Sequence, residues 1–248
     1  MTSSSLEAFT HSEGEAAWGD FAKRALDLAV SAALLLVLLP LALLLAAAIK
    51  LDSRGPVLYR CRRVGRAWSE FDMLKFRKMQ RDASGEALTG ADDHRFTRVG
   101  RLLARSKLDE IPQLWNVVKG EMSLVGPRPE DARFVSKEQE AYRSILTLRP
   151  GITGLTQLAF ARESEILDPR DRVGHYMTRL LPQKARLDCL YVARRSLRMD
   201  LRILVWTAGA VLLRRRIAVH RDTGRLTVRA PRLQDVSAGA AVNQPVVS

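Results

Sequence analysis

Cysteine, histidine and aromatic residues are scarce in this 248-residue chain, and their scarcity argues against several classes of protein. The two cysteines, Cys61 and Cys189, lie far apart and in no metal-ligand spacing, which predicts reduced thiols in a cytosolic setting. The four histidines form no HExxH motif and no Cys/His cluster, so a zinc enzyme is not expected. Aromatic residues make up 6% of the chain and do not alternate with basic residues, as they do in proteins that stack nucleic-acid bases.

Positive charge, by contrast, is in large excess. The formal net charge is +13 and the sequence pI is about 10.5, which predicts an anionic partner. Nucleic acid and an anionic membrane surface both attract such a charge, but the missing aromatic pattern favours the membrane and no nucleic acid. The length allows one large domain or two small ones with a sizeable core.

A long apolar run follows a polar leader. Residues 1–19 are rich in Ser, Ala and Glu and lack the basic start of a signal peptide, so we expect a disordered leader there. Residues 28–49 contain no charged side chain, and their number matches one passage across the hydrocarbon core of a membrane. Pro40, near the centre of the run, removes a backbone hydrogen bond and kinks a helix.

Basic residues flank both ends of this run and bear on its topology. Lys23 and Arg24 precede it, and Lys50 and Arg54 follow it. Because Lys and Arg concentrate on the cytoplasmic side, a spanning helix would leave one cluster on the wrong face. A re-entrant helix-break-helix over residues 20–51, with its break at Pro40, would return both clusters to one face. The residues by themselves leave spanning and re-entrant helices open.

Two adjacent carboxylates, Asp109 and Glu110, interrupt a segment that is otherwise basic and apolar. Apolar residues at helical spacing, together with Pro112, predict a short helix that begins at or just before this pair. Ser106 is a rival N-cap. Asp109 can be a simple helix cap, or it can take part in chemistry, because helix N-termini favour anions.

Three basic residues occupy positions that suit binding of an anion. Arg128 stands between two prolines in a stiff loop, where its guanidinium can grip a phosphate or carboxylate with two hydrogen bonds. Lys75 lies between two apolar residues of a predicted strand and is expected to face a site. Arg149 precedes a Pro-Gly turn whose exposed amides would suit an anion, although the turn can be purely structural.

The remaining pattern predicts secondary structure more than chemistry. Residues 56–59 and 71–76 read as strands of a small β-hairpin, and residues 82–93 as a polar loop. Helices are expected over 130–146, 184–191 and 197–213. The last has basic and apolar faces, which suit either a helix in the headgroup plane or a core helix with one solvated face. Residues 217–248 are expected to be disordered.

The ungapped stretch SKLDEIPQLWNVVKGEMSLVGPRP, residues 106–129, resembles the signature of the bacterial sugar transferases, the monotopic polyprenyl-phosphate phosphoglycosyl transferases. GPVLYRCRRVG and RPGITGLTQ resemble further elements of that family, and the resemblance covers about residues 23–216. It implies an α+β, mostly helical, monotopic membrane protein with a re-entrant helix, a small β-hairpin and amphipathic interfacial helices. The family breaks its membrane helix at a Ser-Pro pair, where this chain has Leu39-Pro40.

The resemblance implies that residues 52–216 form a catalytic domain that transfers a sugar-1-phosphate from a UDP-sugar to polyprenyl (undecaprenyl) phosphate, releasing UMP. This is the initiating step of exopolysaccharide, capsule or O-antigen assembly. Asp109 would be the nucleophile that forms an aspartyl phosphosugar, and Glu110 would position or deprotonate the incoming phosphate. Asp109 would also hold Mg²⁺. The residues expected to bind phosphate are Lys75, Arg105, Arg128 and Arg149.

Arg105 is carried over as a replacement, because the position where the family has an arginine is Ala104 in this chain. The enzyme would lie at the cytoplasmic face of the bacterial inner membrane, and a homodimer is compatible with this interpretation. The alternative is a non-catalytic membrane-surface adaptor that binds anionic lipid or a partner helix. No stretch of the sequence selects a particular UDP-sugar or pathway.

Overall fold

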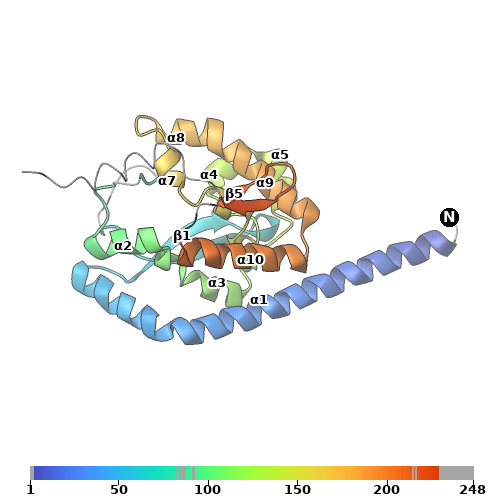
Figure 1. The fold of residues 1–248 in the computed structure, drawn as a ribbon, viewed down its shortest axis with the longest axis horizontal. Helices are drawn as coiled ribbons and strands as arrows, with labels where there is room; N and C mark the ends of the chain where they lie inside the picture. The colour runs from blue at the N-terminus through green and yellow to red at the C-terminus, as the bar shows by residue number, and fades with distance from the viewer. Residues whose placement is uncertain are drawn as a thin grey trace, which may run out of the picture.

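The computed structural model describes residues 3–81, 83, 88–90, 93–213, 215 and 217–228, with side chains described from residue 19 onward. Helices predominate, and the strands in this part of the chain form three two-stranded sheets, so the α+β, mostly helical class is confirmed. One helix, α1 (Ser3–Asp52), passes along one side of the molecule and projects far beyond it (Figure 1).

α1 contains the whole apolar run. Its segment Gly19–Asp52 is long and apolar enough to cross a membrane, with a mean hydropathy of 2.9. The helix continues through Pro40 without interruption and curves in its second half (Figure 1). The break predicted at Pro40 is therefore a bend within one helix, and the re-entrant topology stays a prediction. α1 begins inside the segment 1–19 that was expected to be disordered, and the side chains of residues 1–18 lie outside the description.

Polar contacts anchor α1 near the start of the apolar run. Asp27 is 3% exposed, and its carboxylate accepts hydrogen bonds from the Ser123 hydroxyl at 2.7 Å and the Leu124 N–H at 3.2 Å. Lys23 pairs with Asp27 at 3.3 Å and with Asp200 at 2.9 Å. Because these groups are charged and buried, their pairing fixes where the helix meets the rest of the chain.

Apolar contacts anchor the other end of α1, while its opposite face is uncovered. Leu45 and Ile49 pack in a buried cluster with Phe76 and Leu103. Several apolar side chains of the same helix are exposed, namely Leu36, Val37, Leu39, Leu43 and Leu44. α1 therefore has one face that packs on the protein and one apolar face that meets no part of the described chain.

The predicted hairpin is confirmed, but its first strand begins at Leu58, two residues later than expected, and continues to Val64. β1 (Leu58–Val64) pairs in antiparallel register with β2 (Glu70–Phe76), and the 3-10 turn η1 (Arg66–Trp68) joins them. α2 (Arg98–Ser106) follows and is capped by Thr97, whose hydroxyl accepts from the Gly100 N–H at 2.9 Å. The expected loop 82–93 is described only in part.

Two short parallel strands bring the middle of the chain together. β3 (Ser123–Val125) follows α3 (Gln113–Lys119) and pairs with β4 (Gly151–Thr153). A Cβ on Gly151 would lie 2.1 Å from the Gly126 nitrogen, and a Cβ on Gly126 would lie 2.6 Å from the Arg149 carbonyl oxygen. Only glycine allows this approach, so the two motifs that contain these glycines must lie side by side.

The second half of the domain is helical. The single helix expected over 130–146 is two helices, because the backbone of Glu138 (φ −117°, ψ 40°) leaves the helical region. The helix expected over 184–191 is confirmed as part of a longer one. These elements are α4 (Ala132–Val135), α5 (Gln139–Ile145), α6 (Leu155–Ala159), α7 (Glu163–Ile166), α8 (Arg172–His175), the π-helical turn η3 (Tyr176–Leu180) and α9 (Leu181–Arg194).

α10 (Leu197–Leu212) buries Ile203 but leaves Leu201, Val205 and Leu212 exposed, with exposed fractions of 53%, 69% and 80%. This exposed apolar face favours the interfacial interpretation over a core helix whose polar face is solvated.

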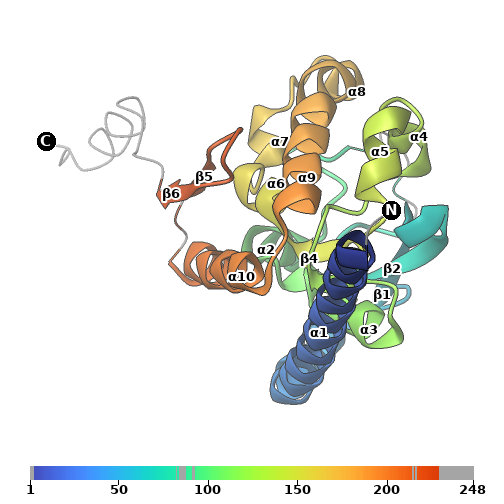
Figure 2. The same cartoon turned by 90° about the vertical axis from the view of Figure 1, so that its right-hand side faces the viewer.

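A hairpin of β5 (Ile217–Val219) and β6 (Leu226–Val228) follows α10 (Figure 2). The sequence had predicted disorder from residue 217. The hairpin is ordered because Ile217 and Leu226 are buried in a cluster with Leu155, and Gly224 supplies the left-handed turn at φ +68°. Residues 229–248 lie outside the description.

Candidate active site

The acidic pair lies in a turn of its own, ahead of the helix that was expected to carry it. Asp109 and Glu110 belong to the 3-10 turn η2 (Leu108–Glu110), and α3 begins only at Gln113, with Pro112 at its N-cap. Neither η2 nor α3 has a side-chain cap, so Asp109 is not a helix cap. Ser106 is not an N-cap either, because it is the last residue of α2. The reason is the left-handed backbone of Lys107 (φ +60°), which ends α2 just before the pair.

Two lysines compensate the charges of the two carboxylates. Asp109 is 2% exposed, and its Oδ2 lies 3.3 Å from the ammonium of Lys78. Glu110 Oε1 accepts a hydrogen bond from the ammonium of Lys75 at 3.0 Å. Sequence reasoning singled out Lys75 and missed Lys78. The only signal for Lys78 was that it is the second lysine of the same segment, KFRKM. A buried carboxylate needs such a partner, so these pairs explain how the acidic turn tolerates its burial.

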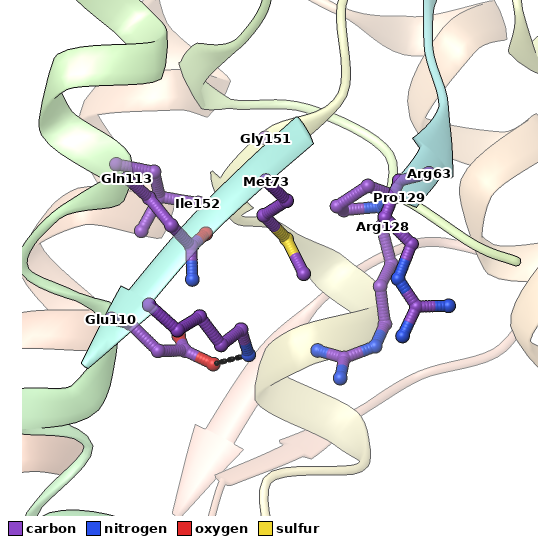
Figure 3. Close-up of a pocket in the computed structure, with 9 residues that line it drawn as sticks. Arg63, Met73, Glu110, Gln113, Arg128, Pro129, Gly151 and Ile152 are labelled. Atoms are coloured by element: carbon purple, nitrogen blue, oxygen red, sulfur yellow. Dashed lines mark hydrogen bonds and ion pairs between the residues drawn. The ribbon is translucent and has the colours of Figure 1, made fainter. Parts of the chain in front are cut away.

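A small pocket opens beside the pair (Figure 3). Glu110 lies on one side of it, and the guanidinium groups of Arg63 and Arg128 lie on the other (Figure 3). Asp109 is not among the residues that line it. The lining residues come from the hairpin, the acidic turn, the start of α3 and both glycine motifs: Arg63, Met73, Lys75, Glu110, Gln113, Arg128, Pro129, Gly151 and Ile152.

Arg128 faces this pocket, as its position between two prolines suggested. Its backbone N–H donates to Asp188 Oδ2 at 3.3 Å, and its Nε lies 3.9 Å from Glu130 Oε1. Burial would lower the pKa of Arg128, but the negative charges of Glu163, Glu130 and Glu110 outweigh it and raise the pKa above its usual value. The guanidinium therefore stays charged at any pH that the fold survives.

A buried polar network supports Arg128 from behind. The ammonium of Lys184, which is 1% exposed, donates to Glu130 Oε1 at 3.3 Å and to the Tyr176 hydroxyl at 2.9 Å. The same ammonium pairs with Glu163 at 2.6 Å, and the Tyr176 hydroxyl donates to Glu130 at 2.8 Å. No sequence pattern predicted this network, because its members come from three helical elements and the loop before α4, and none belongs to a recognisable spacing.

Two carboxyl groups in this region have pKa values shifted in opposite directions. Burial raises the pKa of Glu110, but the charges of Lys75, Arg128 and Lys107 outweigh it and hold the pKa at about 2. Burial raises the pKa of Asp188 to about 7, against the opposing hydrogen bonds from Thr156 and the Arg128 N–H. Glu110 is thus an anion at neutral pH, whereas Asp188 titrates there.

Two residues expected at the site lie elsewhere. The Arg149 Nε donates to the Gly120 carbonyl oxygen at 2.8 Å, at the C-terminus of α3, and Arg149 does not line the pocket. The turn after Arg149 does reach the pocket, through Gly151 and Ile152. Arg105 is exposed in the last turn of α2 and makes no hydrogen bond or ion pair with the part of the chain that the structure describes.

The donor set at the acidic turn fits Mg²⁺ only in combination with a substrate. Within the described residues there is no group of three or more His, Cys, Asp or Glu side chains that could hold a metal ion. Asp109 and Glu110 are adjacent carboxylates, and each has one oxygen directed to a lysine. Mg²⁺ typically takes one or two carboxylates and completes its shell with water and substrate phosphate oxygens, which this pair allows.

Comparison with known proteins places these features in a family. The family model for bacterial sugar transferase matches residues 18–214. The chain is 40% identical over 200 residues to the undecaprenyl-phosphate glucose phosphotransferase of Komagataeibacter xylinus, an alignment that covers 77% of this chain and 36% of that protein.

Two further relatives align over most of their own length. One is the UDP-glucose:undecaprenyl-phosphate glucose-1-phosphate transferase of Caulobacter vibrioides, 38% identical over 198 residues, with 78% of this chain and 70% of that protein covered. The other is the exopolysaccharide production protein PSS of Rhizobium leguminosarum bv. phaseoli, 39% identical over 205 residues, with 77% and 96% covered. The chain therefore spans about a third of the first relative's length and most of the other two.

Proposed function

The chain belongs to the bacterial sugar transferase family and is a transferase, and from this we propose that it moves a sugar-1-phosphate from a UDP-sugar to a polyprenyl phosphate, releasing UMP. The names of two relatives, from Caulobacter vibrioides and Xanthomonas campestris pv. campestris, give UDP-glucose and undecaprenyl phosphate as the substrates of those proteins. Another relative, from Aeromonas hydrophila, is named for UDP-N-acetylgalactosamine. We therefore propose a UDP-sugar as the donor substrate of this protein and do not assign a particular sugar.

One observation carries this proposal. Glu110 stands across a small pocket from Arg128, the buried carboxylate of Asp109 lies next to it in the acidic turn, and each of these two carboxylates is paired with a lysine. Phosphoryl transfer needs a nucleophile and positive charge around the phosphate oxygens, and this arrangement offers both. An adaptor that merely bound anionic lipid would need the positive charges but not the carboxylates.

We assign Asp109 as the nucleophile. Its carboxylate attacks the β-phosphorus of the UDP-sugar, the bond from that phosphorus to the bridging oxygen breaks, and UMP leaves with the bonding electrons. A phosphate oxygen of the lipid then attacks the same phosphorus and releases Asp109 as a carboxylate. Because Asp109 is 2% exposed and touches Lys78, substrate binding has to uncover it before the first step.

The neighbouring groups take supporting roles. Glu110, ionised because its pKa is about 2, can orient the incoming lipid phosphate, but so low a pKa makes it a poor acceptor for a proton of that phosphate, and it cannot donate one at neutral pH. Lys75 and Arg128 are placed to neutralise phosphate oxygens in the pocket. When Mg²⁺ is bound, held by Asp109 and by phosphate oxygens, it adds further positive charge at the transferred group.

The location that we propose is the cytoplasmic face of the bacterial inner membrane. The apolar length of α1 and the exposed apolar faces of α1 and α10 support membrane association. A lipid substrate requires a site at the membrane surface, and the positive net charge suits an anionic one. Exopolysaccharide, capsule or O-antigen assembly is the class of pathway that such a product would enter.

UMP release tests the proposal against its rival. Purified protein in detergent is supplied with a panel of UDP-sugars, with and without undecaprenyl phosphate, and UMP is measured. We expect sustained release with one or more sugars only when the lipid phosphate is present, and none from Asp109→Asn. A membrane-surface adaptor would release no UMP with any sugar, and that result would refute the proposal.

A further inference from the structure

Arg63 is a second guanidinium at the pocket, and the function proposed above gives it no role. It lies in β1 and lines the pocket together with Arg128 (Figure 3). Side chains alternate between the two faces of a strand, so Arg60 and Arg62 project from the other face. Both are exposed, and Arg62 donates to Glu70 across the hairpin at 2.7 Å. Only Arg63 among these three arginines is directed to the site.

The Arg63 side chain lacks a full set of partners. Its Nε is buried and has no hydrogen-bond acceptor within the described chain. Glu130 and Asp131, two carboxylates whose pKa the charge of Arg63 helps to lower, are engaged by other groups. Glu130 accepts from Lys184 and Tyr176, and Asp131 accepts two hydrogen bonds from the Arg133 guanidinium, both at 2.9 Å. A buried N–H without an acceptor is unfavourable, so a missing acceptor is expected in the pocket.

Arg63 and Arg128 also have like charges at one small pocket. Arg128 Nε lies 3.9 Å from Glu130 Oε1, and the charges of both arginines help to lower the pKa of Glu130. Two guanidinium groups at one pocket repel each other, and Glu130, which already accepts from Lys184 and Tyr176, compensates them only in part. Phosphate oxygens match the guanidinium fork. The carboxylate on the far side, Glu110, is already bonded to Lys75. No other carboxylate among the described residues lines the pocket, so the anion that would complete the pair is expected to be part of a ligand.

We propose that Arg63 and Arg128 form a two-arginine clamp for a phosphate group of the ligand, with Arg63 as a binding residue. This inference rests on the proposed function for the identity of the ligand, because both substrates of that reaction carry phosphate. The clamp itself is defined by the chemistry of a phosphate oxyanion, which a nucleotide diphosphate and a lipid phosphate share.

Binding of inorganic pyrophosphate, measured by titration calorimetry on the full-length protein in detergent without metal, tests the clamp. Arg63→Met should weaken binding about 10- to 100-fold, the loss expected for a charge-assisted hydrogen-bonded pair. Arg63→Lys keeps the charge and loses the fork, so it should fall between Met and the wild type. Arg60→Met is the matched control, from the same strand and the opposite face, and should bind as the wild type does.

Further titrations identify the source of the phosphate and separate the two proposals. A loss confined to UDP assigns the clamp to the nucleotide diphosphate, and a loss confined to undecaprenyl phosphate assigns it to the lipid. The clamp is refuted if wild type does not bind pyrophosphate, if Arg63→Met and Arg63→Lys bind it normally, or if Arg60→Met loses as much. If Arg63 binds pyrophosphate and yet no UDP-sugar yields UMP, the clamp stands and the proposed function fails.

Discussion

The ammonium of Lys78 lies 3.3 Å from the carboxylate of Asp109, and this contact joins the end of the β-hairpin to the acidic turn. The Asp109 side chain is almost fully buried, whereas Lys78 is 30% exposed. Lys78 can therefore leave the contact toward solvent or substrate, while Asp109 cannot move far. In our account the ammonium of Lys78 compensates the negative charge of the Asp109 carboxylate until a substrate phosphate binds.

Lys78→Met should accordingly lower UMP release by about tenfold or more, since it removes a positive charge at the reacting carboxylate. It should also lower the stability of the fold by about 1–3 kcal/mol, because the buried Asp109 loses a charged partner. Turnover and chemical unfolding measure the two effects. Lys119→Met, which removes an exposed ion pair with Glu121, is the control and should leave both unchanged. Normal turnover in Lys78→Met would contradict the assignment.

The Lys78 contact also shows where inference from the sequence ends. The alternation of side chains in a strand identified Lys75, which lies inside β2. β2 ends at Phe76, so the alternation no longer places Lys78, and its direction depends on how the following loop leaves the strand. The two carboxylates could be predicted from a motif, but their partners depend on a tertiary contact that no local spacing encodes.

Arg128→Lys tests whether the pocket needs a planar fork or only a charge. The substitution keeps the charge beside Glu130 and removes the second hydrogen bond that a guanidinium can give a phosphate. We expect UMP release to fall about tenfold or more. Arg215→Lys, at an exposed position, should be nearly silent. Equal losses at both positions would mean that general positive charge, and not a positioned group, is what matters.

The sequence predicted the glycine turn beside Arg149 but not the position of the Arg149 side chain. The pattern RPGITG predicted a turn, and the close approach of Gly126 and Gly151 explains why the turn borders the pocket. The pattern could not tell where the long Arg149 side chain would point, and it binds the Gly120 carbonyl instead. A turn that requires glycine can be predicted from the sequence. The direction of a flexible side chain cannot, because it depends on packing.

Asp188 should give the stability of the fold a distinctive pH dependence. Its pKa is about 7 in the folded protein, mainly because of burial, and near 3.8 as a reference, so the folded state binds the proton more tightly. The stabilisation from this proton is therefore complete below about pH 4 and is lost as the pH rises through 7.

The measurement compares the free energy of unfolding of wild type and Asp188→Asn across this range. Relative to the variant, wild type should lose stability as pH rises, with a limiting slope of about 1.4 kcal/mol per pH unit. A difference between the two proteins that stays constant from pH 4 to 8 would show that Asp188 does not titrate in the folded state there.

The topology of α1 can be decided in cells. In a variant without Cys61 and Cys189, single cysteines replace Gly19 and Arg54, which are both exposed and lie on either side of the apolar run. A re-entrant helix shields both from a membrane-impermeant thiol reagent added to intact cells, and both react once the cells are permeabilised. Labelling of one position alone in intact cells would mean that α1 spans the membrane. Pro40→Ala should shift a re-entrant helix toward spanning, because it restores the missing hydrogen bond.

The central claim is a covalent intermediate on Asp109, and Glu110 provides a graded comparison for it. Glu110→Gln keeps the nucleophile but removes an anion bonded to Lys75, so turnover should fall without disappearing. Asp109→Asn replaces the nucleophile with a neutral amide of the same shape, so no phosphosugar can form on it.

Exchange of labelled UMP into UDP-sugar, with no lipid acceptor present, tests this claim most directly. A two-step enzyme forms the aspartyl phosphosugar and free UMP in its first half-reaction, so the reverse step must carry label back into the UDP-sugar. We predict exchange by wild type in the absence of polyprenyl phosphate and none by Asp109→Asn. Exchange at the wild-type rate in Asp109→Asn, or exchange by wild type only when the lipid is added, would contradict the account and favour direct attack by the lipid phosphate.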